Sequence, residues 1–208
     1  MQTFLKTLSL KCCTLLMVLL GTYQLQLFAQ TTQVVRVRGI VESFNNSTIT
    51  INERSGRKLT IDVSEKLGVN EIYKIDLAAI TPNSYIGTAT LPDKDGNMSA
   101  LEVLVFPEAS RGNGEGSYPW DLEPNSTMTN ATVAEFSSMG AARKMHLKYK
   151  DGEKIVYIPE NTPIVTFTPG NLAMIKPGAK VIAFTNVVDG KATVMRISVG
   201  RDGLMPPM

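Results

Sequence analysis

The chain has 208 residues, and its 21 lysines and arginines nearly balance its 19 acidic residues, for a formal net charge of +2. Nucleic-acid-binding proteins typically have a dense basic surface, and a composition this close to neutral does not indicate one. We therefore expect no nucleic-acid partner. The only cysteines, Cys12 and Cys13, lie near the N-terminus. A chain that loses this end has no thiol for a disulfide, a metal site or a nucleophile.

Residues 1–29 have the features of a secretory signal peptide. Lys6 and Lys11 supply its positive charge, residues 12–20 form its apolar stretch, and Ala29 is a small residue at a suitable cleavage position. The apolar stretch is too short to span about 30 Å of hydrocarbon as a helix. We therefore expect cleavage near Ala29, a periplasmic or secreted protein, and no transmembrane segment in the mature chain.

Residues 30–107 alternate apolar and polar side chains, with the period of β-strands that bury one face. Turn-forming pairs such as Ser55-Gly56 and Asp95-Gly96 separate these runs. A short helical turn is expected over 77–80. The expected strands are 35–41, 48–52, 58–63, 84–90 and 99–106.

Residues 108–128 break the strand pattern. A glycine-rich stretch leads into Tyr118, Trp120 and Asp121, which stand among prolines. A phosphate-binding loop would lead directly into a helix, but prolines follow here and no helical period lies downstream. We interpret the segment as a connector whose aromatic residues dock on a surface. Tyr118, Trp120 and Asp121 are therefore candidate binding residues.

The second half of the chain repeats the first. Three short sequences return in the same order, at offsets of 92 to 95 positions: 40–44 at 132–136, 77–83 at 172–178, and 101–105 at 195–199. A repeat of this length is a small domain, too long for a solenoid unit. Its expected strands are 130–136, 144–149, 154–159, 180–186 and 193–199.

The repeat and the strand pattern together predict an all-β fold. We expect two tandem five-stranded OB-like β-barrels, at 30–107 and 129–208, because a small barrel of this type has five strands with an insertion between the third and fourth. The connector at 108–128, with its glycines, prolines and Trp120, joins them.

The connector also collects acidic residues. Carboxylate oxygens bind hard cations such as Ca²⁺, and Glu115, Asp121 and Glu123 are the candidate ligands. Their charges equally suit a solvated surface segment. We expect no cofactor, and no metal site unless these three carboxylates form one.

One hairpin of the second repeat carries a basic patch. Alternation places Lys144, His146 and Lys148 on one strand face, opposite Met145 and Leu147. Such a face attracts polyanions, although a solvated outer barrel face has the same composition. His146 is the only histidine, so it lacks the companions of zinc and copper sites. Lys144, His146 and Lys148 complete the candidate binding residues.

Three stretches carry a family resemblance: RGNGEGSYPWDL at 111–122, NSTMTNATV at 125–133 and GRDGLMPPM at 200–208. They resemble a family of small exported bacterial proteins of unknown function with tandem OB-like domains. The resemblance spans nearly all of the chain after the signal peptide, and it implies a fold and a compartment but no catalytic residue. Similar proteins are often labelled metal ABC transporter permeases, yet a permease needs several membrane spans and this sequence offers only its N-terminal apolar stretch.

These patterns lead to three functional hypotheses. The first is a non-enzymatic binding or assembly module of the cell envelope, whose partner is an envelope protein or polymer and whose contact surface is the connector. The second is an accessory protein that handles a divalent metal ion. The third is a hydrolase of envelope polymers, which would need paired carboxylates such as Glu115 and Asp121 across a cleft.

Overall fold

The computed structural model describes residues 33–139 and 142–208. The expected signal peptide, 1–29, lies outside the described residues. The described chain is all-β, with thirteen strands and only single-turn 3-10 helices between them. None of these helices is long and apolar enough to cross a membrane.

The strands are β1 (Gln33–Phe44), β2 (Thr48–Glu53), β3 (Lys58–Lys74), β4 (Tyr85–Pro92), β5 (Met98–Ala100), β6 (Val103–Val105), β7 (Gly116–Pro119), β8 (Thr127–Met139), β9 (Ala142–Tyr149), β10 (Gly152–Tyr157), β11 (Ile164–Pro169), β12 (Lys180–Val188) and β13 (Lys191–Gly200). The 3-10 turns are η1 (Leu77–Ala79), η2 (Glu108–Ser110), η3 (Leu172–Met174) and η4 (Arg201–Gly203).

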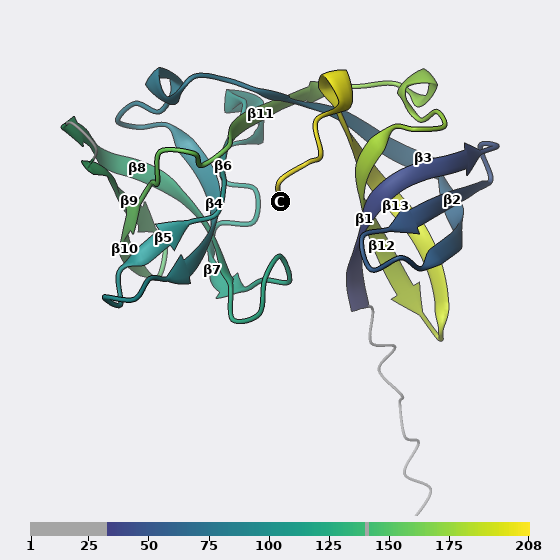
Figure 1. Ribbon diagram of the computed structural model, residues 1–208, viewed down its shortest axis with the longest axis horizontal. Helices are drawn as coiled ribbons and strands as arrows, with labels where there is room; N and C mark the ends of the chain where they lie inside the picture. The colour runs from purple at the N-terminus through teal and green to yellow at the C-terminus, as the bar shows by residue number, and fades with distance from the viewer. Residues whose placement is uncertain (1–32, 140–141) are drawn as a thin grey trace, which may run out of the picture. The chain divides into compact units, whose positions relative to one another are not determined.

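Five strands close into a barrel. They pair in the order β13-β12-β1-β2-β3, and β3 completes the ring by pairing with β13. That last pairing is parallel, whereas the other four are antiparallel. In Figure 1, purple β1 accordingly lies beside yellow-green β12. The inward-facing residues, among them Val37, Ile51, Val181 and Ile197, form one buried apolar cluster.

A second ring of pairings runs through β8, β9, β10, β5 and β4. Antiparallel pairs join β8 to β9, β9 to β10, β4 to β5 and β4 to β8. β10 and β5 meet at a single parallel pair, Tyr157 with Ser99. Ile86, Val133 and Leu147 belong to a second buried cluster inside this ring.

Each ring combines strands from both sides of the connector. The closed barrel takes β1, β2 and β3 from 30–107 but β12 and β13 from 129–208, and the second ring makes the converse combination. The registers correspond: Ile40 faces Lys180, while its repeat counterpart Thr132 faces Tyr85. The sequence pattern predicted that each barrel would be formed by one contiguous segment. A repeat shows which strands are alike but not which copy each strand joins, so the exchange of the last two strands is a feature that only the pairings reveal.

The expected strands are present, with three differences. The run 99–106 is divided into β5 and β6, β3 continues beyond residue 63 to Lys74, and β7 and β11 are additional. A β-bulge recurs at the same point of each repeat, between Val41 and Ser43 and between Val133 and Glu135. The two repeated segments therefore share a structural feature as well as a sequence pattern.

A third apolar cluster packs β6 and β11 against the outer face of the first barrel. Ile182 belongs to it, and Ile182 alternates along β12 with Val181 and Ala183 of the first barrel's interior. Leu104 and Met208 belong to the same cluster. Ile72, Leu104 and Met208 of this cluster also line the site described below.

Candidate functional site

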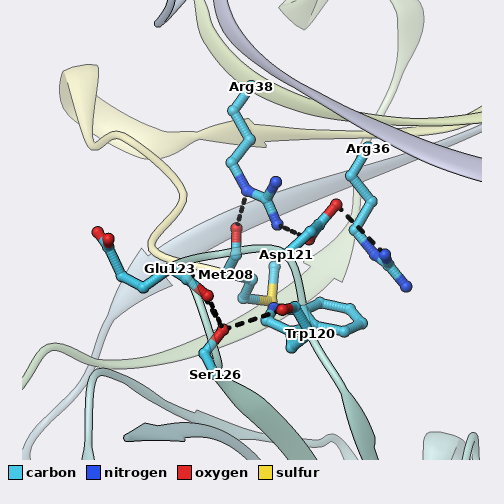
Figure 2. Close-up of polar contacts among 7 residues, drawn as sticks. All are labelled: Arg36, Arg38, Trp120, Asp121, Glu123, Ser126 and Met208. Carbon is cyan, nitrogen blue, oxygen red and sulfur yellow. Dashed lines mark hydrogen bonds and ion pairs between the residues drawn. The ribbon is translucent and has the colours of Figure 1, made fainter.

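The connector is fastened to β1 by arginine–carboxylate contacts (Figure 2). Arg38 donates from Nη2 to Oδ1 of Asp121 at 2.7 Å, and Arg36 Nη1 lies 3.4 Å from Asp121 Oδ2. Arg38 also donates from Nε to the main-chain oxygen of Met208 at 2.5 Å. The Arg38 side chain is only 7% exposed and that of Asp121 is 44% exposed. A nearly buried guanidinium thus depends on two oxygen acceptors from distant parts of the chain.

Asp121 is held as an anion by this arrangement. Its burial opposes ionisation, but the hydrogen bond and charge of Arg38, with the charge of Arg36, outweigh burial and lower the pKa of Asp121. The carboxylate is therefore the ion-pair partner of the two arginines, and a metal ion or a proton would have to displace them.

We expect Asp121→Ala to lower the free energy of unfolding by about 2 kcal/mol at neutral pH, because it leaves the buried Arg38 charge poorly compensated. The pKa of Asp121 is depressed on folding, so this contribution is present at neutral pH and is lost as the pH falls through the folded-state pKa. Urea unfolding measures the difference. The control is Asp62→Ala, whose carboxylate pairs 3.1 Å from an exposed lysine, Lys191, and which should cost less than about 1 kcal/mol. Equal effects of the two substitutions would contradict the expectation.

Trp120 packs against Arg36. The Arg36 Cζ atom lies 3.7 Å from the centroid of the indole ring, a cation–π contact, and the Tyr118 ring is 6.1 Å away. Ser126 Oγ, within 3.1 Å of the Trp120 main-chain oxygen, braces the turn that presents the ring. Trp120 Nε1 and Arg36 Nε are buried, and neither has a hydrogen-bond partner among the described residues. An unpaired buried donor costs about 1–3 kcal/mol, so an acceptor placed here would be stabilised.

These side chains line a cavity of about 550 Å³ between the two rings. Its volume falls within the range of about 300–1,000 Å³ that is usual for small-molecule sites. Five aromatic side chains contribute to the wall: Phe106, Tyr118, Trp120, Phe167 and Phe184. The polar part of the lining includes Arg36, Asn70, Glu102, Asn130, Arg196 and Ser198.

Arg196 is the second arginine of the cavity. Its Cζ atom lies 4.1 Å from the centroid of Phe184. The partial burial of the guanidinium, and then the charge of Arg36, lower the pKa of Arg196. The described residues offer Arg196 no ion-pair partner. Two guanidinium groups thus face one cavity, and only Arg36 has a carboxylate beside it.

Glu102 is a fully buried acid in the lining. Its Oε1 accepts a hydrogen bond from the Ala89 N–H at 3.0 Å, while its Oε2 has no partner in the part of the chain that the structure describes. Burial raises the pKa of Glu102 to about 8, although the Ala89 N–H opposes the shift. Near neutral pH this side chain is mostly protonated, so it adds a hydrogen-bond donor rather than a negative charge.

Asn130 ties the connector to the sheet. Its Nδ2 donates to the Asn113 main-chain oxygen and to Tyr118 Oη, at 3.2 Å in each case. Gly87 faces Asn130 across the β4–β8 pair, and a Cβ atom at Gly87 would lie 2.6 Å from Asn130 Oδ1. The glycine leaves room for the amide. Burial raises the pKa of Tyr118, against the opposing charge of Arg36, so its phenol is neutral.

The candidate residues from the sequence lie in two places. Tyr118 and Trp120 line the cavity and Asp121 binds its arginine, whereas Lys144, His146 and Lys148 lie on β9 and are not part of the lining. On β9, His146 Nε2 lies 3.1 Å from Glu153 Oε2.

The three connector carboxylates are directed to different partners. Glu115 Oε1 accepts a hydrogen bond from the Lys150 N–H at 3.0 Å, Asp121 is bound by two arginines, and the Glu123 carboxylate points away from Asp121 (Figure 2). Across residues 33–139 and 142–208 no group of three or more His, Cys, Asp or Glu side chains is arranged to hold a metal ion.

Four residues of the site were not predicted from the sequence: Arg36, Arg38, Glu102 and Arg196. The first two alternate with Val35 and Val37, a pattern typical of a solvated strand face. Glu102 carried a detectable signal, since it is the single acid in the apolar stretch 100–106. Nothing in the sequence around Arg196 distinguishes it.

Comparison with protein-family models, with curated proteins and with solved structures found no match. The function is therefore inferred from the geometry of this chain.

Proposed function

We propose that this chain is a non-enzymatic ligand-binding module of the cell envelope, exported by residues 1–29, and that its ligand site is the cavity beside Trp120. The observation that carries the proposal is the cavity itself: about 550 Å³, with five aromatic side chains and two buried donors that have no acceptor among the described residues. Ligand sites combine mostly apolar walls with a few placed polar groups in this way. The volume suits a small molecule or the terminal unit of an envelope polymer.

The chemistry of the lining favours binding over catalysis. Asp121 is already bound by two arginines, and Glu102 has its pKa raised to about 8. The arginines and the protonated Glu102 offer positive charge and hydrogen-bond donors, whereas hydrolysis needs a free base or a nucleophile near the reacting atom.

The proposal also includes the fold and the family. The two rings are OB-like barrels that exchange strands, and the chain is a member of the exported family named above. The strand order supports it, because each ring has five strands with one parallel contact, in keeping with a small Greek-key barrel. OB-type barrels bind ligands on an outer face, and this cavity borders outer faces of both rings.

Fluorescence of Trp120, the only tryptophan, tests the proposal directly. Residues 30–208 would be titrated with a panel of aromatic acids, amides, amines and short oligosaccharides, with thermal unfolding as a second readout. A ligand at a hundred times its Kd should add about 2.7 kcal/mol to the free energy of unfolding. Phe184→Ala should weaken binding, whereas Lys148→Ala, on the exposed face of β9, should not. The reverse pattern would place the site on the basic hairpin, and a panel without any response would reject the cavity as a ligand site.

A further inference from the structure

We propose that the ligand is a small organic anion with a flat apolar body, an aromatic carboxylate being its simplest representative, and that Arg36 and Arg196 hold its acid group. This inference rests on the proposed function and names the chemical class that the cavity selects.

The charges around the cavity are unbalanced. Asp121 is shared between Arg36 and Arg38, its contact with Arg36 is the longer at 3.4 Å, and Arg38 is further engaged by the Met208 oxygen. Arg196 has an aromatic face rather than a carboxylate beside its guanidinium. An anion at this end of the cavity would offset the repulsion between Arg36 and Arg196. It would also accept a hydrogen bond from the Nε–H of Arg36, which has no partner among the described residues.

The acid among the lining residues does not oppose an anion. Glu102 is fully buried and mostly protonated near neutral pH, so it carries little negative charge there. Its Oε2 has no partner within the described chain, and in the protonated form this part of the wall is neutral.

The walls select the shape of the rest of the ligand. Phe106 and Phe167 pack edge to face with centroids 5.9 Å apart. Phe184 lies against the guanidinium of Arg196, and Trp120 packs against Arg36. Aromatic faces stack best on flat apolar groups. A strongly hydrated, purely polar anion such as phosphate would leave these walls uncovered.

The test uses three compounds that share one body and differ in charge: 2-naphthoate, 2-naphthamide and 2-naphthylmethylamine. Binding of each to residues 30–208 would be measured by calorimetry at neutral pH. We expect the acid to bind at least about tenfold more tightly than the amide, because only the acid forms charge-assisted hydrogen bonds with the arginines, and the amine to bind more weakly than either.

The matched variants are Arg196→Met and Arg57→Met. Methionine retains much of the apolar stem, so Arg196→Met should reduce the preference for acid over amide to less than about threefold. Arg57 is 68% exposed and lies outside the lining. Its substitution should therefore leave the preference for acid over amide unchanged. If Arg196→Met does not fold, the three compounds on the unaltered chain still decide the question.

Three results would overturn the inference, and they separate it from the proposed function. Equal affinities for acid and amide would leave the binding function standing and remove the anion. No binding by any naphthalene compound, with a response from other members of the wider panel, would reject the ligand class alone. An equal loss of preference in both variants would show that overall charge, rather than this pair of arginines, is what the acid detects.

Discussion

The free energy of unfolding is expected to decrease as the pH rises from about 5 to about 8, and the Glu102→Gln variant is expected to lose most of this decrease. Burial raises the pKa of Glu102 from the usual 4.5 to about 8. Between these values the folded carboxyl keeps a proton that the unfolded chain releases, so each rise in pH favours the unfolded state. The total is on the order of a few kcal/mol, since one pKa unit corresponds to about 1.4 kcal/mol.

Glutamine suits position 102 because its Oε1 can still accept the Ala89 N–H, while its amide nitrogen takes the place of the protonated oxygen. Urea unfolding at several pH values from 5 to 8 measures the effect, and the variant should be the more stable protein at pH 8. The control is Glu108→Gln, an exposed acid whose pKa is lowered by Arg111, so its titration lies below this window. An unchanged slope in Glu102→Gln would mean that Glu102 ionises normally in the folded chain.

The local parts of the fold could be predicted from the sequence. Runs such as Val35-Arg36-Val37 alternate with period 2, and Asp95-Gly96 and Asp189-Gly190 mark turns where the glycines adopt positive φ. Such signals depend on neighbouring residues alone. The second part of β3, beyond residue 63, was not predicted because Gly68 and the polar residues around it break the alternation. Pairing with β13 keeps the backbone extended there.

The long-range parts could not be predicted, because strand partners and side-chain environments are set by distant residues. Trp120 and Asp121 stand out in a connector, where an aromatic and proline cluster is unusual. In the sequence, Arg38 has the pattern of an ordinary solvated strand residue. In the structure it is covered by the connector and by Met208. Glu102 likewise becomes a neutral acid only through burial. Most of the fold class was therefore accessible from the sequence, while only the connector half of the site was.

A separate fragment of residues 33–107 is expected to show no cooperative unfolding transition as a monomer. In the intact chain β1 pairs with β12 and β3 pairs with β13, so the fragment loses the partners on both sides of its three-stranded sheet. Val37 and Ile51 would lose contact with the cluster residues Val181 and Ile197. A chain of this length has little core to spare. Circular dichroism with urea unfolding, together with sedimentation, would measure folding and size.

The matched control is the intact chain cut at one bond, at an introduced protease site between Gly112 and Asn113 in the exposed part of the connector. Both pieces are then present in folded form, and the exchanged strands should hold them together through gel filtration without denaturant. Mixing the separate fragment with residues 108–208 should restore the same cooperative transition. A stable monomer from 33–107 would instead mean that β4 can take the place of β12 beside β1, as expected for a contiguous barrel, and that each repeat folds without its partner. The comparison thus decides whether the two repeats are separable domains or halves of one interlocked unit, in which the cavity between the rings exists only when both are present.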